Sequence, residues 1–199
     1  GGLFDRIVLV YNPANPRIPL TLAESVRDDL RHRLPDLPVT FQPTRYPGHA
    51  RELAHAVAGI GRPLIIAVSG DGVYNEVVNG IMDVDGSNAV SAVAAGGNAN
   101  DHHRSTRRMP LVAAIVDGRA RHLDLLRLSV RTNDTSWSRY AHSYVGLGLT
   151  PLMAIGLNKD MKGTVTELIS VMRTFNRLEP VEISTAGGNP LPALVTAVN

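Results

Sequence analysis

Residues 63 to 82, PLIIAVSGDGVYNEVVNGIM, constrain the fold more than any other stretch of the chain. An apolar run leads into Ser-Gly-Asp-Gly, and Asp-Gly between apolar runs is the strongest short-range signal for a β-hairpin. A hairpin requires apolar and polar residues to alternate after the turn. The apolar residues that follow Gly72 instead recur with helical spacing, at Val73, Val77, Val78, Ile81 and Met82. The stretch therefore predicts a strand, a glycine turn and a helix.

The preceding residues repeat this alternation of short apolar runs and helical patterns. Strands are expected at 6–13, 39–44 and 63–68, and helices at 21–34 and 49–61. The run at 63–68 is apolar on both faces, as in strands of a parallel sheet that is covered by helices on both sides. The pattern predicts an α/β fold with a Rossmann-like parallel sheet.

A second glycine turn follows a small-residue strand near residue 95. Gly96-Gly97 leads into Asn98-Ala99-Asn100-Asp101. Glycines let backbone amides approach a ligand closely, and a helix start presents unpaired N–H groups to an anion. Both turns are expected at the carboxyl ends of parallel strands, where ligands of open α/β sheets bind. Together they indicate a polyphosphate site.

The two commonest phosphate-binding motifs are excluded. The chain has no G-x-x-x-x-G-K-[ST] loop, and SGDGVYN supplies only two of the three glycines of the dinucleotide motif.

The regular alternation of strands and helices gives way to a mixed pattern from residue 122 onward. Strands are expected at about 122–130 and 138–146, followed by a helical stretch ending near Leu178 and strands at 181–185 and 193–198. We therefore expect a nucleotide-binding domain over residues 1–121 and a β-rich domain over residues 122–199.

Charge and composition limit the partners. Lys and Arg number 20 against 18 Asp and Glu, a net charge of +2, which is too small to indicate a nucleic-acid-binding protein. The absence of cysteine excludes disulfides and thiolate metal sites. No apolar stretch approaches the roughly 20 residues that span a bilayer, and with no leader pattern at Gly1-Gly2 we expect a cytoplasmic protein. Basic residues at 102–108 form either a solvated face or a contact for anionic lipid.

Residues Ser69 to Gly80 resemble the GGDGTxNEVxNG signature of the diacylglycerol kinase catalytic domain family, which includes bacterial lipid kinases, sphingosine kinases and ceramide kinases. The G-D-G motif alone is shared with NAD kinases and phosphofructokinases. The N-E-V-x-N-G motif and a later N-D-x-x-R motif narrow the resemblance to lipid kinases. Further segments resemble the family's motifs in the family's order: Asn12-Pro13, Thr44 to Ala50, Ala95 to Arg104, Leu123 to Leu125 and Gly146 to Gly148. The resemblance implies an NAD kinase/diacylglycerol kinase-like fold.

The same resemblance implies an ATP-dependent lipid kinase that uses Mg²⁺ and phosphorylates the hydroxyl of a neutral lipid, such as diacylglycerol to phosphatidic acid. A sphingoid-base kinase is an alternative, because Ser69 replaces a glycine as it does in sphingosine kinases. A non-catalytic nucleotide- or lipid-binding protein is another, because Val73, Asn15-Pro16 and Thr150 depart from the family's pattern.

The resemblance also implies roles for single residues. Asp71 is expected to organise Mg²⁺ or to accept the proton of the lipid hydroxyl, with helix capping as the structural alternative, and Asp124 is a weaker metal candidate. The nucleotide is expected to contact Asn12, Pro13, Thr44, Gly70, Gly72, Val73, Asn75, Glu76, Gly97 and Asn98. For Asn75 and Glu76, capping or holding the loop is an equally good interpretation. None of the seven histidines has metal-ligand spacing, so surface or partly buried positions are expected for them.

The expected partners are ATP, a lipid alcohol and the membrane surface, contacted peripherally. No nucleic acid is expected, and a homodimer is left open. Residues 193–199 resemble a strand that in this family precedes a segment with a catalytic carboxylate. We therefore expect the second domain to be incomplete and that carboxylate to lie beyond residue 199.

Overall fold

The computed structural model describes residues 3–14, 20–95, 109–131 and 133–143 of the chain. The chain divides into two compact units, Gly1–Ser143 and Tyr144–Asn199, and the described residues belong to the first. The second glycine turn with Gly97 and Asn98, the basic residues at 102–108, and the expected elements after residue 144 lie outside the described residues. The expected domain boundary at 121/122 stays a prediction.

Four parallel strands form the central sheet, in the order β2-β1-β3-β4. Their bounds are Arg6–Tyr11 for β1, Val39–Pro43 for β2, Pro63–Ser69 for β3 and Val90–Ala95 for β4. Ile7 of β1 pairs with Val39 on one side and Leu64 on the other. Every residue of β3 is buried, which confirms the parallel sheet predicted from its two apolar faces.

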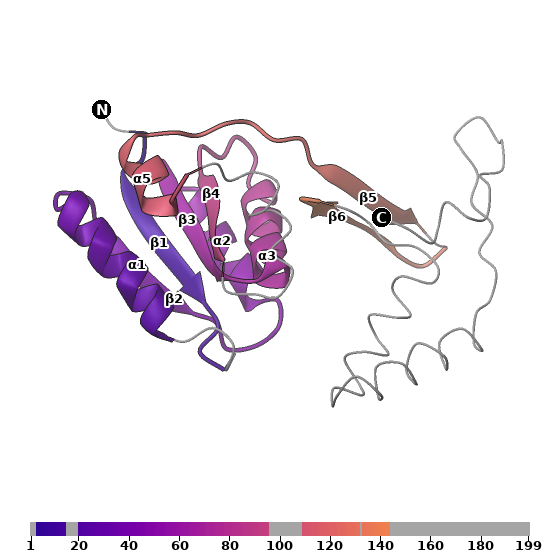
Figure 1. Ribbon diagram of the computed structural model, residues 1–199. Helices are drawn as coiled ribbons and strands as arrows, with labels where there is room; N and C mark the ends of the chain where they lie inside the picture. The colour runs from indigo at the N-terminus through magenta and orange to yellow at the C-terminus, as the bar shows by residue number, and fades with distance from the viewer. Residues whose placement is uncertain (1–2, 15–19, 96–108, 132, 144–199) are drawn as a thin grey trace. The chain divides into compact units, whose positions relative to one another are not determined.

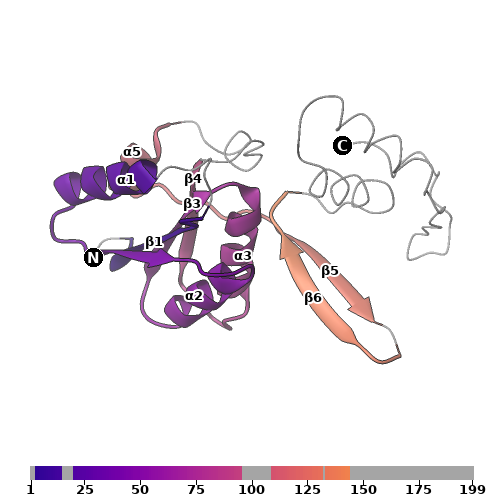
Figure 2. The same ribbon diagram turned by 90° about the horizontal axis from the view of Figure 1, so that it is seen from below.

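Helices cover both faces of this sheet (Figure 1). The helices α1 (Leu20–Arg33) and α5 (Leu111–Val116) pack on one face, and α2 (His49–Ala58) and α3 (Asp71–Met82) pack on the other. Alternate β1 residues point to opposite faces, so Ile7 joins the first core and Val8 the second. Figure 2 shows the same two helix layers from below. The expected α/β architecture is confirmed.

Helices α2 and α3 cross at very short distance. A Cβ placed on Gly80 would overlap the Arg51 carbonyl oxygen and lie 2.8 Å from the Ala54 Cβ. Only glycine fits this position without moving a backbone. The crossing brings the segment before α2 against the first turns of α3.

A two-stranded antiparallel sheet follows, made of β5 (Leu126–Arg131) and β6 (Ser136–Ala141). Both strands were expected here, but β5 begins only at Leu126, because the connection from α5 lines a cavity with residues 119–123 and Leu125. Across the parts of the chain that the structure describes, no helix is both long and apolar enough to cross a bilayer.

Candidate functional site

Three neighbouring strands end at one edge of the parallel sheet, and predicted site residues follow each of them. Asn12 and Pro13 follow β1, Thr44 follows β2 and Gly70 follows β3. The Thr44 N–H donates to the Tyr11 carbonyl at 2.8 Å, which ties the ends of β1 and β2 together. The structure therefore gathers these residues at the edge where ligands of α/β sheets bind.

The turn after β3 leads directly into α3 and is open on its outer side. Gly70, the N-cap residue, has an extended backbone with φ −86° and ψ −173°, and no side chain caps the helix. Within the described part of the chain, a Cβ added to Gly72 would meet nothing within 4 Å. Because the first N–H groups of a helix have no intrahelical acceptor, this turn has the geometry of an anion site.

Val73 stands where the family signature has threonine. Its side chain packs against the core formed by α2, α3 and the sheet. An apolar side chain at this position therefore contributes to packing, and the turn lacks the hydroxyl that a threonine would bring.

Asp71, Asn75 and Asn79 lie four residues apart and share one face of α3. This polar stripe, as we call the three residues, contacts the end of β6. The Asn79 amide nitrogen donates to the Tyr140 carbonyl at 2.8 Å, and the Tyr140 N–H donates back to Asn79 Oδ1 at 2.9 Å. Asn79 is buried and also donates to the Asn75 carbonyl at 2.8 Å.

His142 completes the contact between β6 and the polar stripe. Its Nδ1 lies 3.3 Å from Asn75 Oδ1, and its Nε2 lies 3.7 Å from Asp71 Oδ1. The Tyr74 ring packs edge-on against the imidazole, with 4.9 Å between the ring centroids. The sequence analysis missed His142, because it looked only for metal-ligand spacing and no local pattern marks a partner 67 residues away.

Glu76 points toward α2 and uses both carboxylate oxygens there. Oε1 accepts from the Gly48 N–H at 3.0 Å, and Oε2 accepts from the Ala50 N–H at 3.2 Å. A carboxylate at a helix N-terminus also interacts favourably with the helix dipole. This geometry favours the loop-holding interpretation of Glu76, and a contact with nucleotide stays a prediction.

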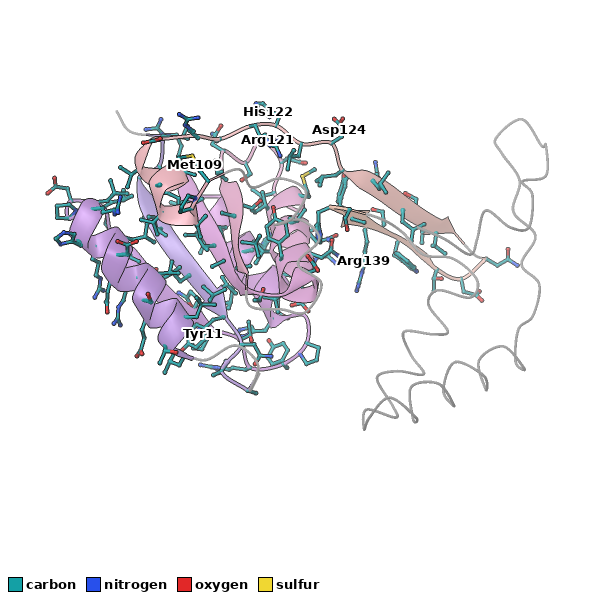
Figure 3. The ribbon with its side chains drawn as sticks, viewed as in Figure 1. Tyr11, Met109, Arg121, His122, Asp124 and Arg139 are labelled. Atoms are coloured by element: carbon teal, nitrogen blue, oxygen red, sulfur yellow. The ribbon has the colours of Figure 1, made fainter. Side chains whose placement is uncertain are left out.

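The described residues offer one carboxylate at the turn but no preformed metal cage. Among them, no three His, Asp or Glu side chains form a group that could hold a metal ion. Magnesium often binds through one or two carboxylates plus substrate phosphates, so Asp71, which is 26 % exposed, fits such a site. Asp124 lies on the exposed connection before β5 with its side chain directed outward (Figure 3).

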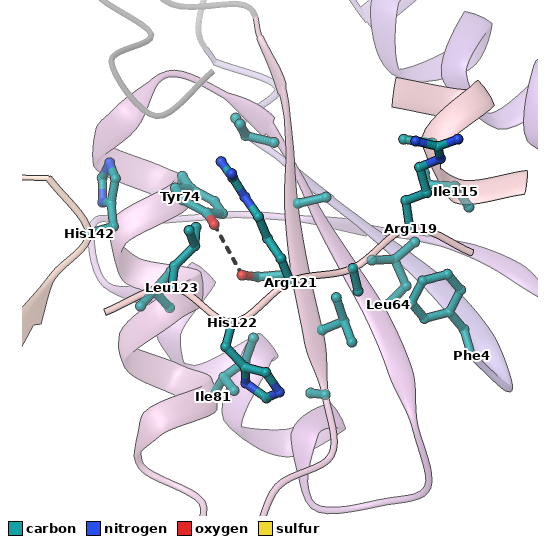
Figure 4. Close-up of a pocket in the computed structure, with 18 of the residues that line it drawn as sticks. Phe4, Leu64, Tyr74, Ile81, Ile115, Arg119, Arg121, His122, Leu123 and His142 are labelled. Carbon is teal, nitrogen blue, oxygen red and sulfur yellow. Dashed lines mark hydrogen bonds between the residues drawn. The ribbon is translucent and has the colours of Figure 1, made fainter. Parts of the chain in front are cut away.

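A cavity of about 630 Å³ lies beside the polar stripe, between α3, β4 and α5 (Figure 4). Its walls are mainly apolar, with Tyr74 and His142 at one end and Arg121 extending over it from the connection. The Tyr74 hydroxyl lies 3.1 Å from Ser91 Oγ. Burial raises the pKa of Tyr74, and the contact with Ser91 opposes this in part, so the phenol is neutral near pH 7.

The family model of the diacylglycerol kinase catalytic domain matches residues 6–128 of the chain. The chain belongs to the diacylglycerol kinase catalytic domain family. The match covers the parallel sheet, the glycine turn after β3 and the start of β5.

Solved structures agree with this membership at the level of the fold. A diacylglycerol kinase from Bacillus anthracis str. Sterne is 23% identical with a TM-score of 0.54, over 67% of this chain and 48% of that one. A second protein from this organism, assigned provisionally as a diacylglycerol kinase, is 22% identical with a TM-score of 0.62, over 96% of this chain and 64% of that one. The family member described here thus spans about half to two thirds of the length of these proteins. No curated protein matches it.

Proposed function

We propose that the chain is the nucleotide-binding part of an ATP-dependent lipid kinase, with diacylglycerol as the first acceptor to test. The observation that carries this proposal is the open, uncapped start of α3, with Asp71 as its first residue, in a member of the diacylglycerol kinase catalytic domain family. Positioning and charge neutralisation are the main requirements of phosphoryl transfer, and this turn offers both.

In the proposed site, backbone amides from Gly70 to Val73 contact the phosphates of ATP together with Gly97 and Asn98. Asn12, Pro13 and Thr44 line the nucleotide pocket. The lipid oxygen forms a bond to the γ-phosphorus while the bond from that phosphorus to the bridging oxygen of ADP breaks. The hydroxyl proton passes to the Asp71 carboxylate, or to the carboxylate expected beyond residue 199, in which case Asp71 serves to organise Mg²⁺.

Magnesium, when bound, would supply charge neutralisation on the phosphates, held mainly by their oxygens and by Asp71. Asp124 is proposed only as a weaker second ligand.

The apolar cavity beside α3 supports a lipid acceptor, because hydrocarbon is the chemistry that its walls would accommodate. We also propose peripheral contact with a membrane, where such an acceptor resides. Ser69, on which the sphingoid-base alternative rests, is buried, and its Oγ donates to the neighbouring Gly70 carbonyl at 2.9 Å. That contact gives Ser69 a local role independent of the acceptor.

The test measures ATP binding by calorimetry and phosphate transfer from labelled ATP to diacylglycerol or sphingosine in mixed micelles. Asp71→Asn should keep the thermal unfolding of the wild type and lose transfer by about 100-fold or more. Asp36→Asn, at an exposed turn, is the matched control.

Three results would redirect the proposal. Preferred transfer to sphingosine would make the protein a sphingoid-base kinase. Binding of ATP with no transfer to any lipid, by this chain and by a version extended beyond residue 199, would make it a non-catalytic nucleotide-binding protein. Wild-type transfer by Asp71→Asn would remove Asp71 from the reaction.

A further inference from the structure

Among the described residues, the polar stripe of α3 contacts residues 140–142 at the end of the hairpin. The partners are far apart in the sequence: Asn79 and Tyr140 are 61 positions apart, and Asn75 and His142 are 67 apart. Asn79 exchanges two hydrogen bonds with the Tyr140 backbone, as paired residues of antiparallel strands do. The backbone at Tyr140 is therefore fixed on α3, and His142, two residues on, is placed beside the glycine turn.

The His142 ring is also held from two sides. Tyr74 packs on it edge-on, and the Asn75 amide meets Nδ1, as donor or acceptor depending on the orientation of the amide. The side chain is only 6 % exposed, so it has little room to turn. Its remaining nitrogen, Nε2, faces Asp71 Oδ1 at 3.7 Å.

We propose that His142 is a positioning residue of the phosphate-transfer site, holding the Asp71 carboxylate beside the glycine turn. This inference rests on the proposed function. With Asn75 Oδ1 at Nδ1, Nε2 carries a proton only in the imidazolium form, whereas with the Asn75 NH₂ turned to Nδ1 the neutral ring carries its proton on Nε2. In both cases this proton faces Asp71 Oδ1, 3.7 Å from Nε2. A fixed carboxylate meets the substrate hydroxyl in one orientation, which is what a proton acceptor in phosphoryl transfer requires.

A purely structural role makes a different prediction. A histidine that only fills space next to Tyr74 can be replaced by an aromatic ring without consequence for the reaction. A histidine that holds Asp71 cannot, because phenylalanine keeps the ring and removes both nitrogens.

The kinetic experiment compares His142→Phe, His142→Gln and the exposed control His55→Gln in the full chain. His142→Phe should unfold at the wild-type temperature, keep KM for ATP and lose between about 10-fold and 100-fold in kcat. His142→Gln, whose amide can donate near the position of Nε2, should recover part of this loss. Wild-type kcat in a folded His142→Phe protein would overturn the proposal, as would a loss that the Gln variant fails to recover.

A second readout does not depend on turnover. With ¹⁵N-labelled histidine, the His142 ring nitrogens should shift in Asp71→Asn and stay unchanged in Asp36→Asn. If neither this chain nor a version extended beyond residue 199 transfers phosphate, the proposed function fails, and the contact is judged by these shifts alone. If Asp71→Asn leaves the His142 nitrogens unmoved, the inference fails even in an active kinase.

Discussion

At the scale of single residues, the family signature contains two kinds of side chain. Gly70 and Asp71 face the open turn, whereas Glu76 and Asn79 hold α3 to its neighbours. From the sequence, Asn75 and Glu76 were assigned to nucleotide, with loop-holding as an equal alternative. The structure gives each of them a protein partner, and such partners are invisible in a linear pattern.

Glu76→Gln tests the holding role directly. The Gln amide NH₂ would face one of the two N–H groups that the carboxylate now accepts, Gly48 or Ala50. Leaving such a donor unsatisfied costs about 1–3 kcal/mol, so the urea midpoint should fall with an unchanged m-value.

Glu52→Gln is the matched control, because Glu52 is exposed on α2, the helix whose start Glu76 contacts, and accepts from the Tyr46 hydroxyl, which Gln can still do. An unchanged midpoint for Glu76→Gln, together with weaker ATP binding, would return Glu76 to the nucleotide pocket.

At the scale of elements, most of the first unit was predictable, and the reasons are physical. The run at 63–68 is buried on both faces, and the helical spacing after Gly72 follows from the one face that α3 buries. The strand predicted from residue 122 begins only at Leu126, because the apolar Leu123 and Leu125 line a cavity wall, and among the described residues 122–125 pair with no strand. His142 was missed because its partners lie on another element.

Gly80→Ala tests the crossing of α2 and α3. The added methyl group would overlap the Arg51 carbonyl oxygen and crowd Ala54, so the helices must separate. Overpacking of this kind costs about 1–3 kcal/mol, which thermal unfolding will detect.

Gly72→Ala is the control for this change, because its Cβ meets nothing within 4 Å. It should leave stability unchanged or slightly higher, since alanine has the better helix propensity. Equal stability of Gly80→Ala and wild type would mean that the crossing is looser than the structure indicates.

An ion pair joins the same two helices. Arg51 donates two hydrogen bonds to Asp83, at 2.6 and 2.8 Å, and these hold the pKa of Asp83 below its usual value. A lowered folded pKa stabilises the protein above the unfolded value of about 3.9. The contribution is lost as pH falls through the folded pKa. About a third of each side chain is exposed, so it amounts to at most about 1 kcal/mol.

At the scale of the whole molecule, the unit Gly1–Ser143 combines two sheets that are formed by separate stretches of the sequence. The parallel sheet carries the glycine turn, and the hairpin carries His142. The contact between them includes the Asn79 side chain, which offers one donor and one acceptor to the Tyr140 backbone, as a residue of a paired strand does. A sequence pattern predicts each sheet separately, whereas this contact requires the folded chain.

Asn79→Ala should therefore release the hairpin while leaving the parallel sheet intact. The change removes both bonds to Tyr140 and leaves its N–H and carbonyl without those partners, at a cost of about 1–3 kcal/mol. Hydrogen exchange of the Tyr140 amide should accelerate, while amides of β1 and β3 keep their protection, because hairpin opening is local.

Two further variants serve as controls. Exchange of the Tyr140 amide in Asn79→Asp should lie between the wild type and Asn79→Ala, since the carboxylate still accepts from Tyr140 but cannot donate. The exposed Asn88→Ala should leave this exchange unchanged. Unchanged exchange at Tyr140 in Asn79→Ala would show that other contacts hold the hairpin. Accelerated exchange together with a fall in kcat like that of His142→Phe would show that the polar stripe transmits the position of β6 to Asp71.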